Sequence, residues 1–262
     1  MRQSEKGFLL LTAHLGDPER PVLTVAQFRD LTKRVRQTVR QDGRREMTEQ
    51  DLVDMGYDRN TARRILYLLD QEDVLNWYLR RVKTCTPLTR GNENYPLLLR
   101  KRLGLDAPGC LWAKGDLTLL NKAAVALVGS RELRTENEAF AQTVGKEAAR
   151  QGYVLVSGNA AGADQAAQNA CLEAGGQVIS VVADRLDEKP ELPNMLWLSE
   201  EGYDLPFSSW RALSRNRVIH SLGIRTFVAQ CAMEKGGTWD GTTKNLHHLL
   251  HRDDAKYQNI FP

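Results

Sequence analysis

The chain has 262 residues, a formal net charge of +3, 42% hydrophobic residues and 26% charged residues. These values are ordinary for a globular protein and suit one large domain, or a main domain with a smaller companion. No apolar run approaches the roughly 20 residues that a membrane span needs, and the N-terminal segment lacks a signal-peptide cleavage site. The four cysteines are far apart and form no CxxC pair, so we expect no zinc or redox motif and a cytoplasmic protein with reduced thiols.

Residues 1–84 have the periodicity of helices. Thr24 precedes an amphipathic stretch with Phe28 and Leu31 on one face, and a second helical pattern begins at Asn60. We therefore predict a small helical N-terminal domain over residues 1–84. Its basic residues form either a solvated face or a nucleic-acid contact. They include Arg34, Arg36, Arg40, Arg63 and Arg64.

Residues 85–262 are predicted to hold a connector and a Rossmann-like domain. The connector, residues 85–122, contains a short strand at 110–113 followed by a turn. From Ala123 onward, near-continuous apolar strands alternate with helices, which indicates an α/β fold with a doubly wound, mostly parallel sheet covered on both faces. We expect strands at 124–128, 153–157, 178–182, 195–198, 226–229 and 257–261. The expected helices are 136–150, 163–174, 208–222 and 241–251.

Four segments suited to anions follow or approach the carboxyl ends of these strands, where ligands bind in such sheets. Glycines let the backbone come close to a ligand, helix N-termini expose free amides, and arginine forms a fork for phosphate oxygens. Each segment alone is equally compatible with tight strand-to-helix packing, but their shared edge favours a phosphate-bearing ligand. The candidate binding residues are Gly129, Ser130, Arg131, Ser157, Gly158, Asn159, Gly162, Arg215, Asn216, Arg217, Lys235, Gly237 and Thr238.

Catalytic and cofactor motifs are missing from the sequence. No GxGxxG fingerprint follows the first strand of the parallel sheet, and there is no Walker A motif and no recognisable Ser/His/Asp set. The spacing of His247 and His251 suits a metal, but without the acid of HExxH we interpret them as surface residues. Asp164 follows the second glycine-rich loop and is interpreted as a structural acid in the first turn of a helix. We therefore predict no catalytic residue, no cofactor and no metal.

Five motifs occur in an order typical of one family. Residues 88–99 are similar to "I-T-x-x-D-x-x-Y-P-x-x-L", and residues 111–116 to "L-Y-x-x-G-D". Residues 125–131 match "V-A-I-V-G-S-R", residues 157–164 correspond to "S-G-L-A-x-G-I-D", and residues 215–219 to "R-N-R-I-I". The series as a whole resembles the DNA-processing protein A (DprA, also called Smf) family over most of the chain.

That resemblance implies a protein without enzymatic turnover. Members of the family bind single-stranded DNA in a basic pocket of the Rossmann domain, form dimers, and help to load a RecA-type recombinase during natural transformation. By position, Arg131, Arg215 and Arg217 would contact DNA phosphates. The pocket would be shaped by Gly129, Gly158 and Gly162.

Three departures from the family keep alternatives open. Many members have Lys or Arg where this chain has Ala161, the usual Glu-Ala is Gln230-Cys231, and no winged-helix extension precedes Pro262. The loop around Gly236 resembles that of related nucleoside-monophosphate phosphoribohydrolases, although Asp240 is the only nearby acid. A sensor of nucleotide-derived ligands is the second interpretation, such a hydrolase ranks lower, and a protein-interaction module without DNA binding is a third.

Overall fold

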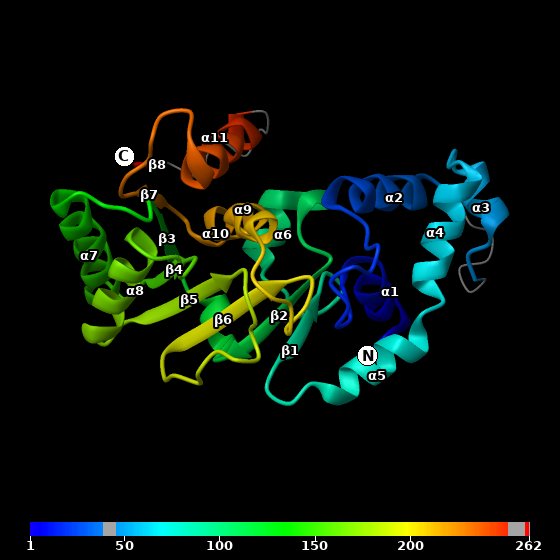
Figure 1. Ribbon diagram of the computed structural model, residues 1–262, viewed down its shortest axis with the longest axis horizontal. Helices are drawn as coiled ribbons and strands as arrows, with labels where there is room; N and C mark the ends of the chain where they lie inside the picture. The colour runs from blue at the N-terminus through cyan, green and yellow to red at the C-terminus, as the bar shows by residue number, and fades with distance from the viewer. Residues whose placement is uncertain (39–45, 251–259, 262) are drawn as a thin grey trace.

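The computed structural model describes residues 1–38, 46–250 and 260–261, and Figure 1 shows their arrangement. In this part of the chain the strands form one eight-stranded sheet with the order β1-β2-β6-β5-β4-β3-β7-β8. The strands are β1 (Thr86–Thr89), β2 (Cys110–Gly115), β3 (Ala124–Val128), β4 (Val154–Ser157), β5 (Gln177–Val182), β6 (Met195–Glu200), β7 (Thr226–Val228) and β8 (Ile260–Phe261).

The prediction of a Rossmann-like, mostly parallel sheet is confirmed. All strands from β3 to β8 pair in parallel with their neighbours, apart from the antiparallel pairing of β6 with β2. The segment predicted as a connector therefore supplies two strands of the sheet, β1 and β2, which form its antiparallel end. β1 occupies the outer edge, a position that tolerates Pro87 because proline has no N–H to give to a second neighbour. Of the strand predicted at 257–261, only Ile260–Phe261 lies within the described residues.

The helices predicted after residue 123 are present with two differences, and one helix, α6 (Leu97–Leu103), lies in the segment predicted as a connector. The expected helix 208–222 is split at Arg215, and the last helix begins at Gly236 rather than near residue 241. The helices of the N-terminal part are α1 (Gln3–Thr12), α2 (Val25–Gln37), α3 (Glu49–Asp54), α4 (Arg59–Leu69) and α5 (Glu72–Arg81). The others are α6 (Leu97–Leu103), α7 (Thr135–Arg150), α8 (Ala163–Glu173), α9 (Ser209–Ser214), α10 (Asn216–Leu222) and α11 (Gly236–Leu250), with short 3-10 turns η1 (Gly104–Asp106) and η2 (Leu117–Asn121).

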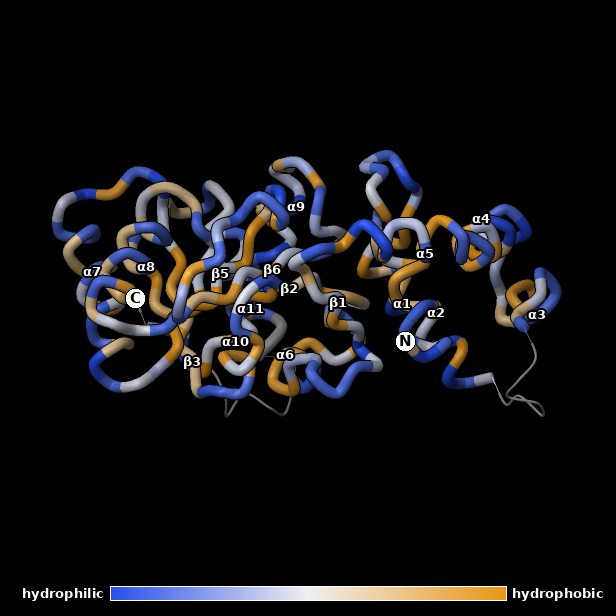
Figure 2. The backbone as a smooth tube through the Cα atoms, turned by 90° about the horizontal axis from the view of Figure 1, so that it is seen from below, coloured by the Kyte–Doolittle hydropathy of each residue, from blue (hydrophilic) through white to orange (hydrophobic). Residues whose placement is uncertain are grey.

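Side chains alternate between two buried layers along each strand. Val125 and Leu127 of β3 pack on the side of α7 and α8, whereas Ala126 and Val128 pack on the side of α6 and α10. Hydrophobic segments accordingly concentrate along the strands in Figure 2, with hydrophilic segments at the outer turns. This alternation is the period of two expected for a sheet covered on both faces.

The N-terminal helices contribute to two different hydrophobic clusters. Leu9 and Leu10 of α1 join the layer that contains Tyr78 and Trp112 and reaches across the sheet. A separate cluster holds α2, α3 and α4 together through residues such as Phe28 and Leu52. The boundary between two domains at residue 84 stays a prediction.

Candidate functional site

The carboxyl edge of the sheet carries a cavity at its topological switch point. β4 and β7 lie on opposite sides of β3, so the connections that follow β3 and β7 diverge and leave a crevice between them. A cavity of about 500 Å³ opens there, and a second of about 230 Å³ adjoins it through Arg131 and Arg215. Of the predicted residues, the larger cavity is lined by Gly129, Ser130, Arg131, Arg215, Asn216, Lys235, Gly237 and Thr238.

The loop after β3 is held from three directions. The Ser130 amide donates to the Gln230 carbonyl at 2.9 Å, and the Ser130 carbonyl accepts from the Ala163 amide at 3.1 Å. The Thr238 hydroxyl donates to the Gly129 carbonyl at 2.9 Å. Arg131 follows in this fixed loop, is exposed, and makes no ion pair with any residue that the structure describes. Its guanidinium is therefore available to an anion in either cavity.

The side chain of Gln230 supports the same loop. Its Oε1 accepts from the Arg134 amide at 3.0 Å and from Asn137 Nδ2 at 2.8 Å, while its Nε2 donates to the Glu132 carbonyl at 3.0 Å. A carboxylate could accept the first two bonds but could not donate the third. The amide at this departure from the family pattern thus fixes the loop that carries Arg131. Sequence reasoning marked Gln230 as unusual but offered no sign of this role.

The glycine-rich segment after β4 forms a turn with few exposed functional groups. Ser157 is buried, donates to the Leu127 carbonyl at 2.9 Å and lines neither cavity, unlike the position predicted for it. Asn159 has a left-handed φ of 59° and lines the smaller cavity together with Gly158 and the exposed Ala161. Gly162, with a φ of 82°, caps the N-terminus of α8 beneath the loop after β3. Its role is to let two loops approach closely.

Asp164 and Arg215 enclose Gly158. A Cβ at Gly158 would lie 2.6 Å from Arg215 Nη2 and 2.7 Å from Asp164 Oδ2. Asp164 accepts from the Ala160 amide at 3.2 Å, and burial raises the pKa of its carboxyl while the charge of Arg215 opposes that rise. This acid holds the loop before α8 and also lines the larger cavity, so its purely structural role stays a prediction.

Arg215 is more deeply buried than a simple phosphate contact requires. Its Nη1 donates to the carbonyls of Gly158 and Val181, and its Nε has no partner in the described structure. Two donated bonds thus brace the ends of β4 and β5, and the remainder of the side chain lines both cavities. The residue is primarily part of the cavity wall.

The prediction that Arg217 faces the same site is wrong. Its Nη2 pairs with Glu200, and it lines a small separate cavity beside Phe28 and Cys110. Arg215 and Arg217 are two residues apart, and positions i and i+2 lie on different sides of a helix. Burial raises the pKa of Glu200, and the positive charge of Arg217 counteracts this rise.

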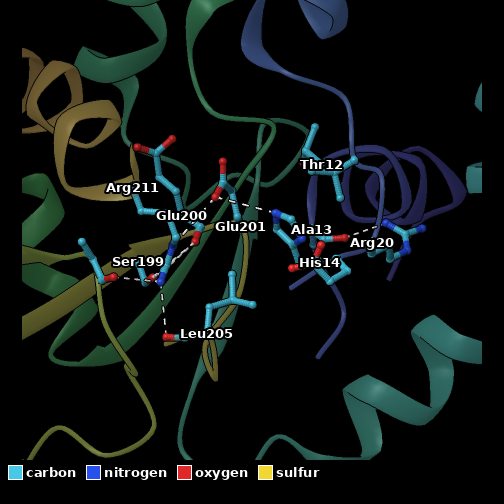
Figure 3. Close-up of polar contacts among 12 residues, drawn as sticks. Thr12, Ala13, His14, Arg20, Ser199, Glu200, Glu201, Leu205 and Arg211 are labelled. Atoms are coloured by element: carbon cyan, nitrogen blue, oxygen red, sulfur yellow. Dashed lines mark hydrogen bonds and ion pairs between the residues drawn. The ribbon is translucent and has the colours of Figure 1, made fainter. Parts of the chain in front are cut away.

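A buried polar network behind α9 was not predicted. Figure 3 shows Arg211 beside Ser199 and Leu205, with Glu201 between Arg211 and His14. Arg211 donates to Ser199 Oγ at 2.7 Å and to the Ala183 carbonyl at 2.9 Å, and its Nε lies 3.8 Å from Glu201 Oε2. The His14 amide donates to the Glu201 carbonyl at 2.7 Å. The network ties the cavity wall formed by α9 to the end of α1.

The last segment of the site is the first turn of α11. Lys235 precedes the helix, and Gly236 with a φ of 80° begins it, so Gly237 and Thr238 belong to the helix and not to a loop. The amides of a first turn have no partners within the helix and attract anions. The Gly237 carbonyl accepts from Asn216 Nδ2 at 3.0 Å, which joins α11 to α10. Lys235 and this turn line the larger cavity but not the smaller one, which the loop after β4 borders.

Other chemistry receives no support from the described residues. Asp240 pairs with Lys244 at 2.8 Å and does not line the cavity, so it is badly placed to act as a hydrolase acid. Within the described ranges there is no group of three metal-ligating side chains. His247 is exposed, whereas His251 lies outside the described residues. No described helix combines the length and hydropathy of a membrane span.

The fold and the site define a Rossmann-like α/β protein with a glycine-lined cavity at the switch point of its sheet. A sequence model of the family "DNA recombination-mediator protein A" matches residues 86–248, and the chain belongs to this family. The resemblance to the DprA/Smf family is thereby confirmed.

Individual relatives agree with this assignment. The chain is 31% identical over 158 residues to DNA processing protein DprA of Bacillus subtilis, covering 56% of this chain and 52% of that protein. It is 35% identical over 175 residues to DprA of Streptococcus pneumoniae, covering 55% of this chain and 62% of that protein. The chain thus spans between half and two thirds of the length of these relatives.

Two solved structures share the fold. The X-ray structure of DprA from S. pneumoniae matches with a TM-score of 0.73 and 24% identity, covering 100% of this chain and 87% of that one. A structure of DprA from Helicobacter pylori, described as showing a single-stranded DNA binding mode, matches with a TM-score of 0.52 and 23% identity. That match covers 68% of this chain and 80% of the other.

Proposed function

We propose that this protein binds single-stranded DNA at the switch-point cavity without catalytic turnover. The observation that carries the proposal is the exposed Arg131 on a loop fixed at three points, in a cavity that Lys235 and the first turn of α11 also line. Arginine forks and free helix amides suit phosphate oxygens, and such contacts supply most of the affinity for a nucleic-acid backbone.

Family membership supports the same role. Relatives carry names that refer to DNA processing, and the H. pylori protein is described as binding single-stranded DNA. We infer in addition a cytoplasmic protein that acts in DNA uptake and recombination, forms a homodimer and delivers the bound strand to a RecA-type recombinase. The location, the process, the homodimer and the recombinase are all inferred from membership of the family.

A sensor of mononucleotides is the second candidate. The cavity of about 500 Å³ lies within the range of sites that enclose one small ligand. Of the cations that line it, Arg131 and Lys235 are the two available to a ligand, because Arg215 donates hydrogen bonds to the backbone. These two cations therefore suit a single phosphate group as well as they suit the successive phosphates of a DNA strand.

The substitution Arg131→Ala tests the proposal. Losing a charged hydrogen-bonding partner for phosphate costs about 1.5–3 kcal/mol, which corresponds to a roughly tenfold to hundredfold weaker affinity. Fluorescence anisotropy with a labelled single-stranded oligonucleotide at two salt concentrations measures this loss. Arg150→Ala is the matched control, because Arg150 is exposed on α7 and pairs only with Glu147 among the described residues.

Two results would reject single-stranded DNA as the ligand. One is the absence of binding at low salt, and the other is an Arg131→Ala variant that binds like the wild type. If a nucleoside monophosphate raises the melting temperature while oligonucleotides do not, the sensor interpretation replaces the proposal.

A further inference from the structure

Cationic side chains gather outside the cavity on α2 and α6, which both pack against the 3-10 turn η1. α2 has four basic residues and one acid, and α6 has three basic residues and no acid. Four of these side chains are exposed, and we call them the basic ridge. They are Lys33, Arg36, Arg100 and Lys101. In Figure 1 both helices lie along the same side of the molecule as α9, α10 and α11.

Arg90 lies half-buried among these groups. Its guanidinium is 5.1 Å from the centre of the Phe28 ring, and its Nη1 donates to the Leu105 carbonyl at 3.1 Å. Burial lowers the pKa of Arg90, and the positive charges of Arg36 and Arg100 lower it further. The guanidinium groups of Arg36 and Arg100 therefore each lie close enough to repel that of Arg90.

Two carboxylates of this region, Asp106 and Asp30, are paired with other arginines. Asp106 pairs with Arg29 at 2.8 Å, and Asp30 pairs with Arg34 at 2.8 Å while also accepting from the Tyr57 hydroxyl at 2.7 Å. The ridge consequently keeps an excess of positive charge. Like charges held together are unfavourable unless an anion neutralises them, so this arrangement favours a negatively charged partner.

The ridge continues from the cavity. α6 packs against α10, whose first residue Asn216 lines the cavity, and α10 has 7 residues and a length of about 10 Å. Arg100 stacks 5.6 Å from the centre of the Tyr95 ring. Burial raises the pKa of Tyr95; the charges of Arg217 and Arg90 oppose that rise and the charge of Glu200 adds to it, because the Arg217–Glu200 ion pair lies near the ring. The exposed cations Arg100 and Lys101 of α6 are thus joined to the cavity through the packing of α6 on α10.

We propose that a single DNA strand leaving the cavity runs across the basic ridge, with its phosphates facing Lys33, Arg36, Arg100 and Lys101. The inference rests on the proposed function and extends it, because the binding site then continues beyond the cavity along the surface. Continuity with the cavity favours a nucleic-acid strand over an acidic protein. The contacts are to phosphates, so they strengthen binding without selecting a sequence.

The length of the bound strand provides the test. Labelled oligonucleotides of about 5 and about 20 nucleotides, one within and one just above the usual range of site sizes, are titrated against the whole chain. We expect the double variant R36A/R100A to bind the long strand about tenfold more weakly and the short strand as the wild type does. The slope of log affinity against log salt for the long strand falls by about 0.7 for each lost contact. The control K146A/R150A removes two exposed charges of α7 and leaves both affinities unchanged.

The outcomes separate this inference from the proposed function. A wild-type chain that binds neither strand rejects the proposed function itself. A wild-type chain that binds both strands, with R36A/R100A equal to it on the long one, rejects the ridge alone. An equal loss on both strands also rejects the ridge, because the substitutions then act on the cavity. Binding of poly-glutamate to the wild type but not to R36A/R100A, with unchanged DNA affinity, assigns the ridge to an acidic protein instead.

Discussion

At Gly162 the absence of a side chain determines how the site is assembled. A Cβ there would lie 2.3 Å from the Arg131 carbonyl oxygen and 2.5 Å from that of Ser130, and the φ of 82° is itself unfavourable for other residues. The glycine therefore lets the loop after β3 rest on the start of α8. The position of Arg131 depends on this contact.

The pair Gly162→Ala and Gly152→Ala separates crowding from backbone strain. Gly152 also has a positive φ, of 74°, but no atom lies within 4 Å of the place that a methyl group would take. Strain alone costs about 1–2 kcal/mol, and overpacking against backbone atoms adds about 1–3 kcal/mol. Urea denaturation should show the larger loss in the free energy of unfolding for Gly162→Ala. Equal losses would mean that the two loops can move apart at no cost.

Ala161 leaves the loop after β4 without a charged side chain at the edge of the site. It is exposed and lines the smaller cavity next to Arg131. With alanine at this place, the cations that line the smaller cavity are Arg131 and the backbone-bonded Arg215. Along the proposed path of the strand, the cations of α2 and α6 would supply further positive charge.

In the segment from α9 to β7, some residues line the cavity and others only stabilise the fold. The break at Arg215 turns α10 away from α9, so Asn216 lines the cavity and Arg217 does not. Periodicity predicted one helix here because both halves have helical spacing. Only the packing of α10 against α6 and α11 fixes the break.

The packing of α10 against β7 predicts a stability that depends on pH. His220 of α10 is 1% exposed, and its Nδ1 lies 3.3 Å from the Thr226 hydroxyl. Burial lowers the pKa of His220 from 6.5 to about 4. The unfolded chain therefore takes up the proton first, so the stabilisation is complete above pH 6.5 and is lost as the pH falls through about 4.

The expected loss is about 3 kcal/mol of unfolding free energy across this window. Comparing the wild type with His220→Gln by urea denaturation at several pH values measures it, since glutamine cannot titrate. The wild type should lose more stability on acidification than the variant does. Parallel curves for the two proteins would show that His220 is not buried in its neutral form.

For the whole molecule, the main question is whether the N-terminal helices unfold with the sheet. Leu10 of α1 is 2% exposed and shares a hydrophobic cluster with Trp112 of β2 and Leu155 of β4. Tyr78 of α5 donates to Asp204 Oδ1 at 2.6 Å and stacks on Tyr203. These contacts join the helices to the sheet, so we expect a single cooperative transition.

Leu10→Ala tests this coupling. Removing a buried leucine side chain costs about 2–5 kcal/mol, and in a cooperative unit the cost affects every part of it. Far-UV circular dichroism and tryptophan fluorescence should shift together along the urea axis. A helical signal lost in a separate, earlier transition would show that the N-terminal helices unfold independently.

Local spacing along the chain was enough to predict the α/β class, the near-continuous apolar strands and the glycine-rich edge at which the site lies. These features are readable without the fold, because side-chain period and glycine geometry act within a few residues. The five ordered motifs also identified the family.

Which of the predicted side chains share the cavity became apparent only in the folded chain. Arg131 and Lys235 lie there, Ser157 and Arg217 are turned away, and Arg211 is joined through Glu201 to the N-terminal helices. A buried charge must find its partners wherever the fold brings them, often from distant segments of the chain. Spacing along the sequence contains no information about such partners, so only the tertiary contacts reveal which donors are left free for a ligand.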